Sequence, residues 1–588
     1  MLLAVAIDAP CSNETLQQPD HDSRMDKYTP RTWNPGERPT LPGSPSTPEH
    51  STPKRVAYFI VGLIVALTGG LGNGLVTANI LNLQGSLGAY AYQMQWLPAA
   101  YVMTIVSMNL LLVKFRQQFG LRLFTEAFLI LYALVTFAHL YANTLSSAIA
   151  VRAAHGMVGG ALGVLGLYYT LQAFPARHRL KGVVLGLGFA QLALPLARIF
   201  TSELLQLGEW HGLYLFELGM CLLALGCVLA LKLPPGDRMQ TFEPLDFLTF
   251  ILFAPGVALL CAVLAQGRTA WWMDSQWVGV CLAASIILIV TALAIEHNRT
   301  RPLLNTRWLS TGKIAKLFLS VLLFRIVLSE STGAVGFLQA LGLNTDQMQN
   351  LFVVVLLGSV AGLVVSAITI NPATIHRSLM FALLLIAAGA LIDAHATSQT
   401  RPANMYVSQF LLAFGGTYFL GPTMVAGMGA VIAEPRNLVS FSVMFTMTQN
   451  LGGLLGAAIV GTIQTAREKY HSSYLVEHLT MLDPNVAARV QSGASAYGSV
   501  LTDPVLRSAA GVARLGAAAT REANVLAYND VFLMIAVVAI VTFLWMLVSQ
   551  FWTTITTGAR RLVGPVHDAQ TAMSIVPITN SEPSNDRK

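Results

Sequence analysis

The chain has 588 residues, of which 54% are hydrophobic and only 11% are charged. Soluble proteins carry charge on about a quarter of their residues, so a set of soluble domains is excluded and a surface that faces lipid is indicated. The net charge of +7 does not call for a nucleic-acid partner, because basic loops between membrane spans account for it.

Apolar stretches recur along the whole chain. Each is close to the roughly 20 residues that a helix needs to cross a bilayer. Several are interrupted by Gly or Pro, which membrane helices tolerate. They predict an all-α, multi-pass membrane protein of about fourteen transmembrane helices, at residues 56–77, 96–113, 123–141, 147–169, 182–205, 213–231, 247–265, 277–295, 315–336, 351–370, 379–394, 407–432, 439–463 and 531–552.

The basic residues of the short loops indicate the orientation, because Lys and Arg are retained on the cytoplasmic side. With a cytoplasmic amino terminus, the outer loops hold only Arg268 and Arg401. With an even number of spans, both termini are then cytoplasmic. The loops on the cytoplasmic side hold Lys114, Arg116, Arg122, Arg177, Arg179, Lys181, Lys232, Arg238, Arg299, Arg301, Arg307, Lys313, Lys316, Arg377 and Arg436.

Three segments fall outside the predicted spans. Residues 1–54 are rich in Pro, Ser, Thr and Asp and predict a disordered cytoplasmic tail. Residues 565–588 form a second polar tail, also expected in the cytoplasm. Residues 466–529 show helical spacing and Ala- and Val-rich runs. They predict either a helical hairpin or a mobile loop on the outer side.

Motifs for common catalytic chemistry are missing from the sequence. The Gly312-Lys313 pair has Arg307 where a phosphate-binding loop needs its first Gly. There is no HExxH zinc signature, no GxSxG nucleophile motif and no paired-Cys metal spacing. We therefore expect no enzyme activity, cofactor or metal site. Transport of a small molecule driven by an ion gradient is the leading hypothesis.

Ionisable residues within spans are costly, and are therefore usually paired, hydrated or functional. Arg152 and His155 are three positions apart and share a helix face. Arg325 and Glu330 are five positions apart and are not expected to pair with each other. The candidates are His139, Arg152, His155, Arg198, Glu217, Arg325 and Glu330.

Each candidate has a functional and a structural interpretation. Glu330, which is flanked by two serines, and Glu217 are candidates for reversible protonation, but Glu217 and Arg152 could instead form ion pairs that hold helices together. His139 and His155 are candidate proton carriers or interhelical hydrogen-bonding groups. Arg152, Arg198 and Arg325 are candidates for the substrate pathway or a charge network, and Arg198 could also extend towards the interface.

Small residues and prolines form a second class of candidates. Gly156 and Gly160, and likewise Gly452 and Gly456, have the GxxxG spacing that permits close helix packing. Pro195 and Pro422 are expected to kink their helices, which suits gating but does not establish it.

Several short motifs carry a family resemblance. Arg152-Ala-Ala-His155-Gly156 resembles the fourth-helix motif RxxQG, with His in place of Gln. Similar matches lie at 266–275, 302–303, 452–456 and 527–530. Across about residues 56–555 the chain resembles the fourteen-helix drug:proton antiporter branch of the major facilitator superfamily (EmrB/QacA type).

The sequence also departs from that pattern. The loop at 113–122 has no acidic residue where the family carries one. The fifth-helix motif keeps Pro195, but has Leu194 and Arg198 where Gly is usual. Asn73 stands in the region where related antiporters carry an Asp. Proton coupling would then involve Glu217, Glu330 or a histidine, or the protein couples transport in another way.

The resemblance implies a domain plan and a partner. It implies an amino-terminal six-helix half at 55–243, two additional linking helices at 244–297 and a carboxy-terminal six-helix half at 298–564, the two halves being pseudo-symmetric. It further implies proton-driven efflux of hydrophobic or amphipathic compounds across a bacterial inner membrane. A periplasmic adaptor and an outer-membrane channel are implied partners, and residues 466–529 could contact the adaptor.

Two other functions remain open. One is export of a specific metabolite, siderophore or anionic lipid, with Arg152, Arg198 and Arg325 as the anion-binding groups. The other is a membrane scaffold that does not transport, which the lost acidic positions suggest.

Overall fold

The structure is a computed structural model that describes residues 33–34, 37–39, 43–206, 210–272 and 274–562, apart from the side chains of residues 202, 206, 330–332 and 552–562. Throughout these residues the regular structure is helical, with no strand. The predicted all-α fold class is confirmed. The carboxy-terminal tail expected at 565–588 lies outside the described residues.

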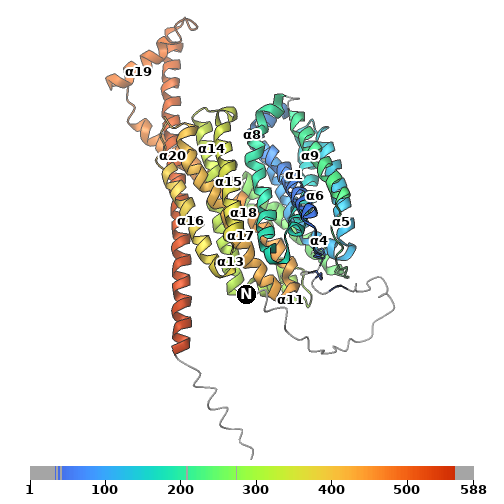
Figure 1. Ribbon diagram of the computed structural model, residues 1–588. Coiled ribbons are helices and arrows are strands. Elements are labelled where there is room, and N and C mark those ends of the chain that lie inside the picture. Colours follow the sequence, from blue (N-terminus) through green and yellow to red (C-terminus); the bar gives the residue numbers. More distant parts are fainter. Residues whose placement is uncertain (1–32, 35–36, 40–42, 207–209, 273, 563–588) are drawn as a thin grey trace, which may run out of the picture.

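The helices fall into two groups that stand side by side, with a helical pair between them in sequence (Figure 1). The first group contains α1 Thr52–Ala78, α2 Ile80–Leu87, α3 Ala91–Met94, α4 Trp96–Phe119, α5 Leu121–His139, α6 Leu145–Ala173, α7 Arg179–Gly188, α8 Ala193–Gln206 and α9 Trp210–Ala230. The pair is α10 Pro244–Gln266 and α11 Gln276–Asn298. The second group contains α12 Thr306–Leu309, α13 Gly312–Val327, α14 Glu330–Ala340, α15 Gln349–Thr369, α16 Ile375–Asp393, α17 Tyr406–Ala433, α18 Leu438–Glu477, α19 Pro484–Ser495 and α20 Pro504–Leu562. Short 3-10 turns connect or extend them at η3 Ala176–His178, η4 Phe189–Leu192, η5 Thr345–Met348, η6 Pro372–Thr374, η7 Pro402–Met405 and η8 Pro435–Asn437.

Thirteen helices in the described part of the chain are long and apolar enough to cross a membrane. The span expected at 315–336 differs, because it is divided into α13 and α14 at Leu328 and Ser329. The Ser329 hydroxyl donates a hydrogen bond to the carbonyl oxygen of Arg325, 3.4 Å away. Such local serine bonds bend helices.

The two predicted kinks differ in outcome. Near Pro195 the span is divided into α7, the 3-10 turn η4 and α8. Proline has no N–H to bond the carbonyl four residues earlier, which favours such an interruption. Pro422 instead lies inside α17, which continues through it.

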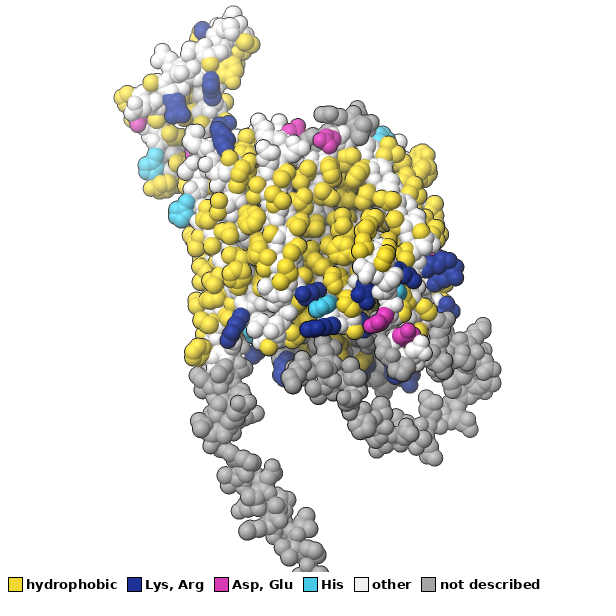
Figure 2. All heavy atoms as spheres, in the orientation of Figure 1, with side chains coloured by type: hydrophobic (Ala, Val, Ile, Leu, Met, Phe, Trp, Pro, Cys, Tyr) yellow, Lys and Arg dark blue, Asp and Glu magenta, His cyan; other side chains and the backbone are white. Residues whose placement is uncertain are grey.

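Apolar side chains join the two groups and cover the outside of the molecule. Val184 of α7 packs with Leu363 of α15, and Val183 packs in one cluster with Met424 of α17. The α10–α11 pair packs mainly on α4, and α10 also contacts α18. Figure 2 shows a broad hydrophobic belt, with Lys and Arg gathered along its lower edge. We call that edge, where α4 finishes and α13 begins, the basic end.

Residues 43–51, which we expected to belong to a disordered tail, pack against the basic end of the first group. Ser44 and Ser46 are buried. The Ser46 amide donates to the carbonyl of Pro235 (2.9 Å), and the Ser46 carbonyl accepts from Gln172 of α6 (2.9 Å). Burial lowers the pKa of His50, which also contacts Gln172. The disorder prediction is therefore wrong for this segment, because a few backbone hydrogen bonds suffice to hold it.

Residues 466–529 are largely helical and stand away from the belt (Figure 1). The 40 residues of α18 make a helix of about 60 Å, about twice the thickness of a hydrocarbon core. Its end, together with α19 and the beginning of α20, forms the extension that we call the hairpin.

The GxxxG glycines of α6 predict a testable packing constraint. A Cβ atom at Gly156 would lie 2.3 Å from the Tyr101 carbonyl oxygen on α4, whereas at Gly163 of the same helix nothing lies within 4 Å. We expect Gly156→Ala to lower stability by about 1–3 kcal/mol, because backbone cannot yield as a side chain does. Gly163→Ala should leave it nearly unchanged. Thermal unfolding in detergent measures both, and equal melting temperatures would contradict the close packing.

Candidate functional site: a buried charge cluster beside a central cavity

An ionisable cluster lies inside the first helix group, away from solvent. Glu217 of α9 and His155 of α6 are both fully buried, and the carboxylate Oε1 is 2.9 Å from the imidazole Nε2. The Tyr132 hydroxyl of α5 donates to the same oxygen at 3.0 Å. Three helices therefore converge on one carboxylate.

Arg152 connects this cluster to α1. It lies one helical turn from His155, and its Nη1 donates to the Gly72 carbonyl (2.7 Å) and lies 3.2 Å from the His155 Nδ1. Its Nη2 donates to Asn73 Oδ1 (2.8 Å). The guanidinium also lies over the Tyr101 ring, 4.7 Å from its centroid.

These contacts assign the hydrogen positions. Arg152 can only donate, so the Nδ1 of His155 accepts and its Nε2 carries the hydrogen. This Nε2 lies 2.9 Å from Glu217 Oε1 as an ion-pair contact, and it has no aligned hydrogen-bond partner among the described residues. A further proton on His155 would place an N–H against the arginine. Within the described residues Glu217 Oε2 has no hydrogen-bond partner.

A second histidine borders the cluster. His139 of α5 is fully buried, stacks on Tyr214 with ring centroids 4.6 Å apart, and lies 5.1 Å from the His155 ring. Its Nδ1 is 3.2 Å from the Val135 carbonyl, and its Nε2 has no partner in the described part of the chain.

A cavity of about 2580 Å³ runs between the two helix groups. Its walls include Asn73 and Tyr101, two of the residues that contact Arg152, whereas Arg152, His155 and Glu217 are not among the lining residues. The charge cluster thus lies directly behind the cavity wall. A change in the cluster can reach the cavity through these two side chains.

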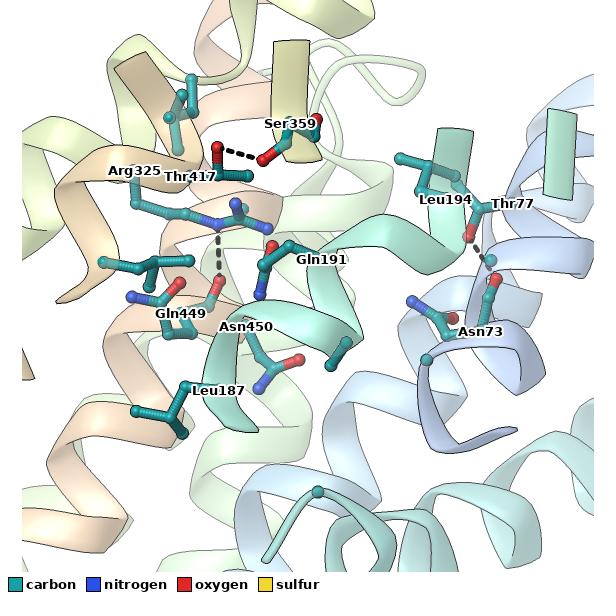
Figure 3. Close-up of a pocket in the computed structure, with 18 of the residues that line it drawn as sticks. Asn73, Thr77, Leu187, Gln191, Leu194, Arg325, Ser359, Thr417, Gln449 and Asn450 are labelled. Carbon is teal, nitrogen blue, oxygen red and sulfur yellow. Dashed lines mark hydrogen bonds between the residues drawn. The ribbon is translucent and has the colours of Figure 1, made fainter. Parts of the chain in front are cut away.

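The cavity contains polar groups from both helix groups. Figure 3 shows Arg325 of α13 pointing towards Gln191 across the space, with Gln449 and Asn450 of α18 nearby. Arg325 Nε donates to the Gln449 carbonyl at 2.9 Å. Arg198 of α8 lies over the Phe352 ring of α15, 5.2 Å from its centroid. Leu187 and Leu194 add apolar surface to the same wall.

The arrangement of two helix groups around one cavity agrees with the sequence comparisons. The profile of the Major Facilitator Superfamily matches residues 59–457, more than half of the chain. The chain belongs to the major facilitator superfamily. It is therefore an integral membrane transporter of small molecules and not an enzyme.

Among curated proteins, this transporter is similar to Multidrug resistance protein 3 of Bacillus subtilis (strain 168), with 22% identity over 422 residues, which cover 69% of this chain and 79% of that protein. Multidrug transporter protein MdtP of the same organism is 21% identical over 464 residues, which cover 76% and 82%. The crystal structure of the human organic anion transporter MFSD10 (TETRAN) matches with a TM-score of 0.50 and 12% identity, covering 84% of this chain and 100% of that chain. At this identity the likeness shows the fold alone.

The structure brings four of the candidate residues of the transporter together and separates the others. His139, Arg152, His155 and Glu217 form the buried cluster, whereas Arg198 and Arg325 line the cavity. The Glu330 side chain lies outside the described residues, so its role stays a prediction. In the described part of the chain no group of three or more His, Cys, Asp or Glu could hold a metal ion.

The glycines of the second GxxxG motif pack against α13. A Cβ atom at Gly452 would lie 3.0 Å from the Arg325 side chain, and one at Gly456 would overlap Ser329. In α6, Gly160 faces the Leu112 side chain of α4, 3.1 Å from where its Cβ would lie. Both motifs therefore serve helix packing, and the second also positions Arg325.

Sequence reasoning missed the aromatic partners of the cluster and a second ionic group. Tyr101, Tyr132 and Tyr214 belong to no sequence motif, and only the structure shows that they lie beside the cluster.

At the basic end, Lys114 of α4 pairs with the buried Asp246 of α10 at 2.6 Å, and Arg299 pairs with Asp246 (3.0 Å) and Glu296 (2.6 Å). The acidic partner absent from the loop at 113–122 is thus supplied by α10. The sequence signal that indicates this ionic group is an acidic residue, Asp246, near the start of an apolar helix.

Proposed function

We propose that this protein is a proton-coupled secondary transporter of the fourteen-helix drug:proton antiporter branch, and that it exports hydrophobic or amphipathic compounds by alternating access. The distant likeness to two multidrug proteins supports the substrate class. A large cavity with apolar walls between two helix groups supports the transport mode.

The observation that carries the proposal is the fully buried pair of His155 and Glu217. A carboxylate in a membrane protein interior is costly unless it is paired or functional. This one retains an oxygen, Oε2, without a partner in the described residues, so a proton can be added without breaking an existing bond to that atom.

Protonation would act on the cavity through Arg152. With Glu217 ionised, its charge offsets that of the arginine. With Glu217 neutral, Arg152 is left as an uncompensated buried cation, and its hydrogen bonds to α1 are those to the Gly72 carbonyl and to Asn73. The packing of α1 against α6 would then differ between the two protonation states. Because the proton site and the cavity are separate, exchange of proton for substrate proceeds through this helix contact.

The energy source is sufficient for accumulation. One charge that crosses a potential of 100 mV supplies about 2.3 kcal/mol, which corresponds to a concentration ratio of roughly fifty. Nucleotide hydrolysis is not needed.

The basic end is proposed to face the cytoplasm of a bacterial cell, with the chain in the inner membrane and both termini inside. The concentration of Lys and Arg at this edge supports the orientation (Figure 2). The hairpin would then project on the opposite side.

Flux in proteoliposomes tests the proton site. We expect a pH gradient to drive uptake of a rhodamine dye by the wild type, and Glu217→Gln to abolish the gradient dependence while dye exchange continues, because the amide keeps the shape but cannot gain a proton. His155→Gln, which restores the residue of the family motif, should weaken the gradient dependence. Glu126→Gln on the surface of α5 is the matched control.

Glu330→Gln is measured in parallel, since Glu330 is the other candidate carboxylate. Full gradient dependence in both Glu217→Gln and Glu330→Gln would remove the proton-site assignment.

The hairpin is the proposed contact for a periplasmic adaptor that would lead to an outer-membrane channel. Leu482 and Val500 are 93% and 77% exposed there, and we propose them as apolar positions of this contact. We expect Leu482→Glu with Val500→Glu to lower efflux from intact cells without changing flux in proteoliposomes. Ser492→Glu, which places the same charge at an exposed polar position, is the control. Unchanged efflux from cells would refute the contact.

A further inference from the structure

The charged residues of the central cavity are almost all of one sign. Among the described residues that line it there is one carboxylate, Asp346, and there is no lysine. The cations are the arginines Arg116, Arg177, Arg179, Arg198, Arg268 and Arg325. The cavity therefore has a positive electrostatic potential, which concentrates anions.

None of these six arginines takes part in an ion pair with a described residue. By contrast, the buried cations Lys114 and Arg299 at the basic end each bond a carboxylate. The cavity arginines therefore differ from these two cations in having no carboxylate partner among the described residues. A guanidinium group in a partly dehydrated cavity loses hydration energy that an anionic partner would restore.

Arg325 and Arg198 are the two arginines best placed within the spans. Arg325 uses its Nε for the Gln449 carbonyl, and no described residue accepts a hydrogen bond from its two terminal nitrogens. Neutral amides, Gln191 and Asn450, line the cavity with it. Arg198 contacts the Phe352 ring and likewise has no hydrogen-bond acceptor among the described side chains or backbone. A guanidinium group presents five donors suited to a carboxylate or sulfonate.

We propose that the substrates are amphipathic organic anions, whose carboxylate, sulfonate or phosphate group is attracted into the cavity by its unpaired arginines and binds at Arg325 or Arg198. The apolar part of the substrate lies against Leu187, Leu194 and the Phe352 ring. An organic cation of the same size would meet this positive potential, with Asp346 as the single carboxylate among the described lining residues. This assignment rests on the proposed function, in which the cavity is the substrate-binding site. It concerns the charge of the substrate and is independent of which residue binds the proton.

Equilibrium binding to the purified, full-length protein in a neutral detergent tests the assignment. The probes are sulforhodamine B, an anion, and rhodamine B methyl ester, a cation with the same ring system, and fluorescence anisotropy reports binding. We expect the anion to bind more tightly. Arg325→Gln and Arg198→Gln should each weaken its binding about tenfold or more, the effect of losing a hydrogen bond to a charged group.

Three controls complete the experiment. Arg325→Lys should retain part of the affinity, because the charge remains while the paired donors are lost. Arg401→Gln removes an exposed arginine outside the cavity and should leave binding unchanged. Displacement of the dye by phosphatidylglycerol but not by phosphatidylcholine would identify an anionic lipid as the source of the anion. Absence of such displacement would identify a free solute.

Tighter binding of the cationic dye, or anion binding that is equal in wild type, Arg325→Gln and Arg198→Gln, would overturn the proposal. Gradient-driven flux of the cation alone would overturn it while leaving the proposed function intact. Anion binding that depends on both arginines, together with flux that ignores the pH gradient, would support the substrate class and reject proton coupling.

Discussion

The Glu217 carboxylate has no access to solvent, and this constraint organises the first helix group. Its charge must be offset inside the protein, because lipid cannot do so. The offset comes from His155 at 2.9 Å, from the Tyr132 hydroxyl and from the Arg152 guanidinium beyond the histidine. Those partners are carried by α6 and α5, so the carboxylate determines how these helices and α9 pack.

The same constraint explains the small residues around the cluster. Gly72 exposes the carbonyl that Arg152 bonds, and a Cβ at this position would lie within 3 Å of Tyr132, His155 and Glu217 atoms. Gly156 allows α4 to approach α6 closely enough for Tyr101 to cover the arginine. The cavity wall and the charge cluster are thus two faces of one packed unit. A change of charge on one face must be accommodated on the other.

Much of this arrangement could be predicted from the residues alone. Hydropathy located the spans, and the three-residue spacing of Arg152 and His155 placed them together. What could not be predicted depends on contacts between distant helices. The positions of these residues in the sequence do not show that Glu217 contacts His155 or that Arg325 lines the cavity. Helical periodicity tells which face of its own helix a residue occupies, but it does not tell which other helix packs against that face. The division at Ser329 and the packing of Ser46 involve a few individual hydrogen bonds, which composition does not reveal.

In the proposed mechanism, proton binding at Glu217 is linked to occupation of the cavity. Calorimetry measures this link directly when the binding of whichever rhodamine dye the protein takes up is recorded at one pH in two buffers of different ionisation enthalpy. We expect the binding enthalpy of the wild type to depend on the buffer in the way that corresponds to proton release on binding. We expect this buffer dependence to be lost in Glu217→Gln. Equal enthalpies in the two buffers for the wild type, or the same proton release in Glu217→Gln, would contradict it.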